Sequence, residues 1–94
     1  MLIIKIFIYI SIMSIVTANN ESGLFEAANS HYNKGNYGDS IELYEKIILG
    51  DFHSSDLYYN LGNAYYREGL VGQSIWAYNK AILLNPRLGD AKYN

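Results

Sequence analysis

Residues 54–86 of this 94-residue chain, SSDLYYNLGNAYYREGLVGQSIWAYNKAILLNP, contain the pattern that decides the fold. Apolar residues recur every three or four positions on both sides of Gly69, which predicts two amphipathic helices. Ser54 or Ser55 can cap the first helix, and Gly69 can end it because a left-handed backbone costs glycine little. The second helix is expected to begin at Gly72 and to end before Pro86, since proline disfavours helix in the residue before it. The stretch therefore predicts a helical hairpin.

Each predicted helix of this hairpin carries an apolar stripe. In the first helix the stripe contains Tyr58, Leu61 and either Ala64 or Tyr65. For the second helix we expect the buried stripe to consist of Ile75, Tyr78, Ala81 and Ile82. Gly62 and Ala81 are small, so they are well placed for a close crossing of the two helices.

The chain repeats its pattern after 34 residues without a gap. The aligned pairs include Tyr32 with Tyr66, Gly35 with Gly69, Gly38 with Gly72, Ser40 with Ser74, Ile41 with Ile75, Tyr44 with Tyr78 and Lys46 with Lys80. A period of this length is typical of helix-turn-helix repeats. A second hairpin is therefore predicted over residues 21–54, with Ser22 as a cap, Gly35 as a stop and a helix from Gly38 to Leu49 that Gly50 ends.

The apolar positions of this earlier hairpin are less regular. Its first helix is expected to turn Leu24, Ala27, Ala28 and His31 inward, and its second helix to bury Ile41, Tyr44, Ile47 and Ile48. Phe52 stands where the later hairpin has Pro86. Terminal repeats of a solenoid are commonly atypical in this way.

The later hairpin resembles the tetratricopeptide repeat (TPR) family. The signature positions are occupied by Tyr58, Leu61, Gly62, Tyr65, Ser74, Tyr78, Ala81 and Pro86, and only Ser74 departs from the usual alanine. The resemblance implies an all-α fold, an α-solenoid of TPR hairpins. Its units would span residues 21–54 and 55–88, and residues 89–94 would start a third unit. In such a solenoid the first helix of each unit lines a concave groove that binds protein segments.

A narrower resemblance is to the exported TPR proteins of the bacterial aerotolerance (BatE-type) family. The runs Asp56–Tyr66 and Ser74–Ala81 carry it, and the second continues through Asn85-Pro86-Arg87 to Asp90–Asn94. It implies a leader followed by TPR units and then membrane-spanning segments and an SH3-like domain. The implied function is a scaffold or adaptor of the bacterial cell envelope.

Residues 1–18 have the composition of a secretory signal peptide. An apolar stretch contains Lys5 as its one basic residue and is followed by Val16-Thr17-Ala18, small or short residues of the kind that a signal peptidase needs. Cleavage is expected after Ala18, which would place the mature protein in the periplasm or cell envelope. An uncleaved leader, which would anchor the chain to a membrane, is the alternative.

Composition argues against several other functions. The net charge is −2, and a mildly acidic chain lacks the basic surface that nucleic acids require. Cysteine is absent, and His31 and His53 have no companions at metal-ligand spacing. His31 is expected in the core or an interface and His53 in solvent. Glu42 and Glu45 are expected to form solvated contacts with Lys46. We therefore expect no catalytic residues, metal or cofactor, and no enzymatic activity.

The family geometry places eight side chains in the concave groove. They are Phe25, Asn29, Tyr32, Asn33, Tyr59, Asn63, Tyr66 and Arg67. Asparagines could bond the backbone of an extended partner segment, and the aromatic rings would add contact area. The alternative is that Tyr59 and Tyr66 only pack between repeats. Phe25 stands where TPR proteins that clamp a carboxyl terminus have a lysine, which argues against that ligand.

The last face of the solenoid has no expected cover. Tyr78, Ile82 and Trp76 would remain partly bare after the second unit. Three interpretations stay open: the sequence is part of a longer protein, the chain dimerises, or it is marginally stable. The second functional hypothesis is accordingly a self-association or spacer module of a larger membrane protein.

Overall fold

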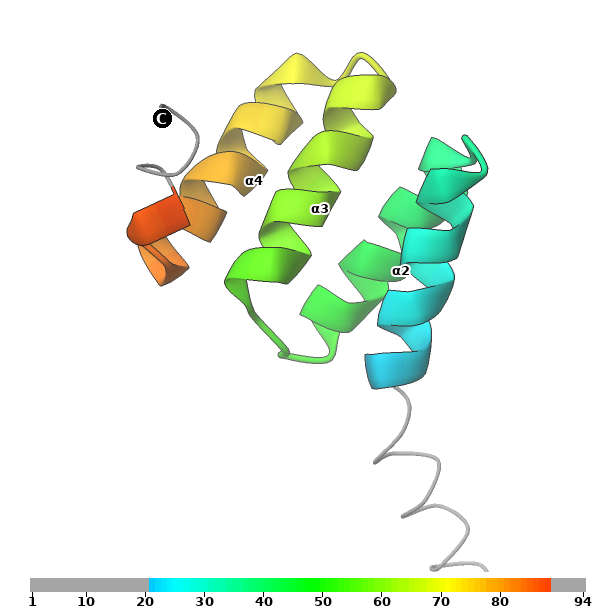
Figure 1. Ribbon diagram of the computed structural model, residues 1–94, viewed down its shortest axis with the longest axis horizontal. Coiled ribbons are helices and arrows are strands. Elements are labelled where there is room, and N and C mark those ends of the chain that lie inside the picture. Colours follow the sequence, from blue (N-terminus) through cyan, green and yellow to red (C-terminus); the bar gives the residue numbers. More distant parts are fainter. Residues whose placement is uncertain (1–20, 89–94) are drawn as a thin grey trace, which may run out of the picture.

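The computed structural model describes residues 21–88, and their regular structure is helical. The first described helix covers residues 21–33, followed by α2 (Tyr37–Leu49), α3 (Ser55–Arg67) and α4 (Val71–Leu84). The first helix pairs with α2, α3 pairs with α4, and the two hairpins stack side by side (Figure 1). This arrangement is consistent with the predicted solenoid of helical hairpins.

The turns within the two hairpins share one geometry. Gly35 and Gly69 both have a φ of +81°, the left-handed conformation that was predicted at these two stops. The amide of Gly69 donates to the carbonyl of Tyr66 at 3.0 Å, and the amide of Leu70 donates to that of Tyr65 at 2.9 Å. Gly35 and Asn36 repeat these bonds in the first hairpin. Two carbonyls near the end of each first helix are thereby satisfied, and the second helix starts directly after the turn.

The link between the hairpins ends α2 and caps α3. The hydroxyl of Ser54 accepts a hydrogen bond from the amide of Leu57 at 3.1 Å, so Ser54 and not Ser55 is the N-cap. At the end of α2, Gly50 has an ordinary φ of −77°. The left-handed residue is Asp51, with a φ of 63°. Gly50 is thus the C-cap of α2, but its freedom to adopt positive φ is not what turns the chain.

One apolar core runs through both hairpins. The residues that share it are Ala28, Tyr44, Ile47, Leu57, Leu61, Ala64, Tyr65 and Ala77. Leu24, Ile41 and Ile48 pack against its edge and are partly buried. Because α2 and α3 both contribute to this core, each hairpin covers apolar surface of the other.

The stripe predicted for α4 is wrong at two positions. Ile75 is 56% exposed and Ile82 is 36% exposed, whereas Ser74, Ala77 and Ala81 are buried. The Ser74 hydroxyl donates to the Gly62 carbonyl at 2.9 Å, so the serine that replaces the usual alanine is satisfied. Small residues let α4 lie close to α3, and the larger isoleucines stay on the edge that α3 does not reach.

Helix starts also differ from the prediction. Both α2 and α4 begin one residue early, at Tyr37 and Val71, because the turn bonds end there. Ser22 lies inside the first helix and is not its cap, since Glu21 is already helical.

The predicted leader (residues 1–18) and the predicted start of a third unit (residues 89–94) lie outside the described residues. Within residues 21–88, no helix has the length and apolar character needed to cross a bilayer.

Candidate functional site

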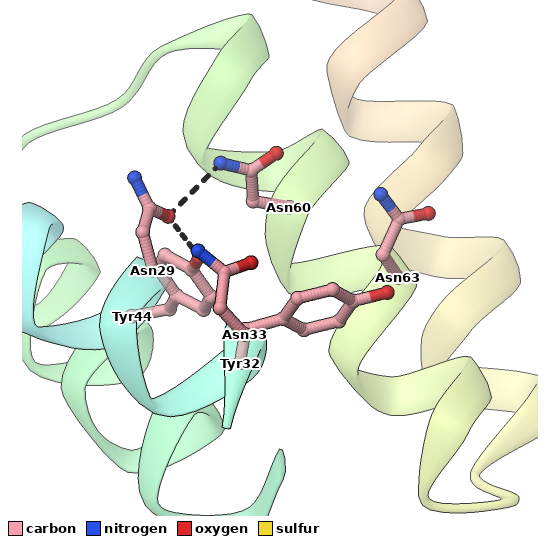
Figure 2. Close-up of a pocket in the computed structure, with 6 residues that line it drawn as sticks. All are labelled: Asn29, Tyr32, Asn33, Tyr44, Asn60 and Asn63. Atoms are coloured by element: carbon pink, nitrogen blue, oxygen red, sulfur yellow. Dashed lines mark hydrogen bonds between the residues drawn. The ribbon is translucent and has the colours of Figure 1, made fainter. Parts of the chain in front are cut away.

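A polar hollow of about 290 Å³ opens between the first helix and α3. We call it the amide hollow, and its lining consists of Asn29, Tyr32, Asn33, Tyr44, Asn60 and Asn63. Figure 2 shows these side chains converging from the two hairpins. None of the six is charged at neutral pH, so the hollow offers hydrogen bonds and ring surface only.

Asn29 is at the centre of the hydrogen bonds in the hollow. Its Oδ1 atom accepts a hydrogen bond from the hydroxyl of Tyr44 and a second from Nδ2 of Asn60 at 3.2 Å (Figure 2). These two bonds connect the first helix to α2 and to α3. The Asn29 oxygen is therefore occupied, and the Nδ2 group is the donor that remains on this side chain.

The second hairpin repeats this bond. The hydroxyl of Tyr78 donates to Oδ1 of Asn63, as Tyr44 does to Asn29 one repeat earlier. Burial raises the pKa of both Tyr44 and Tyr78, so these hydroxyls stay protonated donors at neutral pH. Both asparagines are thus held with their oxygen toward the second helix of their own unit. A ligand in the hollow would meet amide donors, which suit peptide carbonyls.

The structure brings four of the eight predicted groove residues together in the amide hollow: Asn29, Tyr32, Asn33 and Asn63. Phe25 lines a separate hollow, with its ring centroid 6.0 Å from that of Tyr44. The Tyr59 ring lies tilted on Tyr78 at 5.8 Å.

The other two predicted groove residues, Tyr66 and Arg67, do not line the amide hollow. Tyr66 is 63% exposed. Arg67 packs over the Tyr37 ring at 5.3 Å from the centroid, and its Nε donates to the Tyr37 hydroxyl at 3.1 Å. This contact joins α3 to the start of α2 and occupies part of the guanidinium.

Sequence reasoning missed Tyr44 and Asn60 as lining residues. Tyr44 was assigned to the buried stripe, and its ring is indeed buried while its hydroxyl reaches Asn29. Asn60 lies three residues before Asn63, a spacing that places both on one helix face. That spacing was the signal that could have identified Asn60.

His53 is exposed, as predicted, and it also makes local contacts: Nδ1 lies 2.8 Å from the Tyr58 hydroxyl and Nε2 lies 3.1 Å from Oδ1 of Asp51. Glu45 is exposed as well, and it accepts a hydrogen bond from the Tyr65 hydroxyl at 2.6 Å. The prediction for Glu45 named Lys46 as its partner and missed Tyr65 on α3.

Among the described residues, no group of three acidic, histidine or cysteine side chains could hold a metal ion. His31 is partly buried, and its Nδ1 atom has no hydrogen-bond partner there.

Comparison with known families identifies one repeat. Residues 55–88 match the tetratricopeptide repeat model, so this part of the chain is a TPR. No curated protein matches the chain. TPR repeats generally mediate protein–protein interactions and are generally non-catalytic.

Proposed function

We propose that this chain is a non-catalytic interaction scaffold that binds an extended partner segment in the groove between the first helix and α3. The observation that carries the proposal is the amide hollow, where four asparagines from two hairpins converge. Asparagine amides can bond a peptide backbone whatever its side chains are, and Tyr32 adds an apolar ring. The six described lining residues carry no charge at neutral pH, which favours a peptide backbone over a terminal carboxylate.

Asn33 offers the sharpest test of this binding. It is exposed and lines the hollow, and its side chain takes part in neither of the hydrogen bonds that join Asn29 to Tyr44 and Asn60. Peptides would be selected from a phage-displayed random library on the full chain, and their affinity measured by fluorescence anisotropy. Asn33→Ala is expected to weaken binding about threefold to tenfold, the effect of one lost hydrogen bond.

Asn79→Ala on α4 is the matched control, because Asn79 is an equally exposed asparagine outside the hollow. It is expected to leave the affinity unchanged. Failure to select any saturable peptide, or peptides that Asn33→Ala binds as well as the wild type, would reject the proposal.

The proposed location is the bacterial cell envelope, in a role like that of the BatE-type aerotolerance proteins. The leader-like composition of residues 1–18 and the resemblance of the run Asp56–Tyr66 to those proteins support this part. Expression of the full chain in a bacterial host and sequencing of the mature amino terminus would test it. A start at Asn19 is expected, and a full-length chain in the soluble cytoplasmic fraction would contradict export.

A second candidate function is self-association, as a module or spacer of a larger membrane protein. The observation that favours it is the exposed pair Ile75 and Ile82 on α4. Their counterparts one repeat earlier, Ile41 and Ile48, pack against the core that the next hairpin completes. A second copy could cover the α4 pair in the same way.

Sedimentation at increasing concentration would test self-association. The wild type is expected to gain mass with concentration, and the double variant Ile75→Ser/Ile82→Ser to remain a monomer. Leu49→Ser is the control, since Leu49 is 86% exposed and belongs to α2 and not to α4. A wild type that stays monomeric throughout would reject this function.

A further inference from the structure

A second hollow, of about 380 Å³, opens beside the amino-terminal ends of the first helix and α3. We call it the acidic-rimmed hollow, and its lining consists of Glu21, Ser22, Phe25, Ile47, Phe52, Ser54 and Asp56. Phe25, Ile47 and Phe52 supply apolar surface, while Glu21 and Asp56 are exposed carboxylates. Its volume lies within the range of sites that bind small ligands.

This hollow follows the amide hollow along the same groove. On the first helix, Phe25 lies one turn before Asn29, and on α3, Asp56 lies one turn before Asn60. On α2, Ile47 lines one hollow and Tyr44 the other. The packed rings of Phe25 and Tyr44 stand between the two. A single extended segment could therefore occupy both.

The charged residues that the structure describes in this lining are both acidic. Within residues 21–88, no lysine or arginine lines the acidic-rimmed hollow, and its remaining polar residue on the α3 side, Ser54, accepts a hydrogen bond from the Leu57 amide. The apolar walls favour a large apolar side chain. The two carboxylates favour positive charge beside it, because opposite charges across an interface attract and like charges repel.

From these contacts we infer the class of partner: a segment that inserts a bulky apolar side chain, flanked by lysine or arginine, into the acidic-rimmed hollow. The inference rests on the proposed function, since the same segment lays its backbone across the amide hollow. Phe25 and Asn33 lie about 12 Å apart along the first helix at 1.5 Å a residue. An extended segment covers that distance with about four residues.

Three synthetic peptides would test this inference on the isotope-labelled full chain by NMR titration. The basic peptide is Lys-Phe-Lys-Gly-Ser-Gly-Ser-Gly, the acidic peptide has glutamate for both lysines, and the third has serine for phenylalanine. The basic peptide is expected to shift the amide signals of residues 21–25 and 52–56 together with those of the amide hollow. It should bind about tenfold more tightly than either counterpart, and raising salt from about 50 mM to about 500 mM should remove most of that advantage over the acidic peptide.

Variants of the carboxylates separate charge from folding. Glu21→Gln/Asp56→Asn is expected to weaken binding of the basic peptide about threefold to tenfold. The third peptide, with serine in place of phenylalanine, should bind this variant as weakly as it binds the wild type. The control is Glu26→Gln/Asp39→Asn, which removes one exposed acid from the first helix and one from the first turn of α2 without touching the hollow. It should bind like the wild type.

Two results would overturn the inference. If the basic and acidic peptides bind equally, with shifts confined to the amide hollow, the charge and anchor assignment is wrong while the proposed function stands. If none of the three peptides shifts residues 21–25 and 52–56, the anchor site is also wrong. The proposed function fails separately, when library-selected peptides are insensitive to Asn33→Ala.

Discussion

At the scale of single residues, Gly62 sets how closely α3 and α4 approach. A Cβ atom added there would lie 2.7 Å from Cδ1 and 2.8 Å from Cε1 of Tyr78, whose hydroxyl is bonded to Asn63. Replacing a helical glycine with alanine normally gains up to about 1 kcal/mol. Here the clash outweighs that gain, and we expect Gly62→Ala to lower the free energy of unfolding by about 1–3 kcal/mol in urea denaturation.

Gly72→Ala is the matched control, because Gly72 is also helical and an added Cβ meets nothing within 4 Å. It should be neutral or stabilising. Equal stability of the two variants would show that the Tyr78 ring can move aside at little cost.

The Tyr65 hydroxyl is expected to make the free energy of unfolding fall as the pH becomes alkaline. Burial, then the hydrogen bond to Glu45 and its charge, raise the pKa of Tyr65. A raised pKa in the folded state stabilises the protein fully below the unfolded value of about 10, and this contribution falls as pH rises above it. Between about pH 9 and about pH 11.5, the unfolding free energy of the wild type is expected to fall more steeply with pH than that of Tyr65→Phe. The difference in slope should be up to about 1.4 kcal/mol per pH unit.

Tyr66→Phe is the comparison for this titration, since Tyr66 is 63% exposed and adjacent in sequence. Its profile is expected to follow the wild type. A Tyr65→Phe profile parallel to the wild type would remove the Tyr65–Glu45 pair as the cause.

Sequence patterns identified which residues are apolar and periodic, but not which polar atoms meet. The bonds from Tyr44 to Asn29 and from Tyr78 to Asn63 cross between the two helices of a hairpin. Their formation depends on the rotation of each helix about its axis, which a repeat period does not fix. For the same reason Glu45 was assigned to Lys46 within its own helix and not to Tyr65 on the next hairpin.

At the scale of elements, α3 has a side-chain cap at its amino-terminal end and α2 does not. Ser54 caps α3 with its hydroxyl, whereas Asn36 precedes α2 without a side-chain bond. Ser54→Ala should therefore lower the unfolding free energy by about 1 kcal/mol, and Asn36→Ala by clearly less. Thermal unfolding followed by circular dichroism would measure both. Equal losses would mean that the cap bond contributes nothing beyond general helix preference.

The positions of the helices and of their carboxyl ends could largely be predicted from the sequence. Glycine adopts a positive φ at little cost, so a glycine after an amphipathic stretch indicates where the helix ends. Gly35 and Gly69 end their helices as predicted. The buried face of α4 was not predictable from periodicity alone. Ile75 and Ile82 stand at the positions that Ile41 and Ile48 occupy in α2, but whether such positions are covered depends on the neighbouring helix.

At the scale of the whole molecule, the repeat period predicted the stacking of hairpins and the rough position of the groove. The division of that groove into an amide hollow and an acidic-rimmed hollow was not predicted. The link residues Phe52 and Ser54 line the acidic-rimmed hollow together with Phe25, whose ring packs against that of Tyr44 in the lining of the amide hollow. The 34-residue shift aligns Phe52 with Pro86, but it does not show which side chains of a link line a hollow.

The shared core also predicts how the two hairpins unfold. Ile47, 2% exposed in α2, belongs to the core cluster that continues into α4 through Ala77. Trp76, the single tryptophan, lies on α4 in the other hairpin. We expect Ile47→Ala to lower the unfolding free energy by about 2–4 kcal/mol, and to shift the Trp76 fluorescence transition in urea as far as the helix signal. Leu49→Ala, on the same helix but 86% exposed, should shift neither transition.

A Trp76 fluorescence midpoint that stays in place in Ile47→Ala, while the helix signal splits into two steps, would mean that the hairpins unfold independently. The core between them would then stabilise each unit without coupling the two.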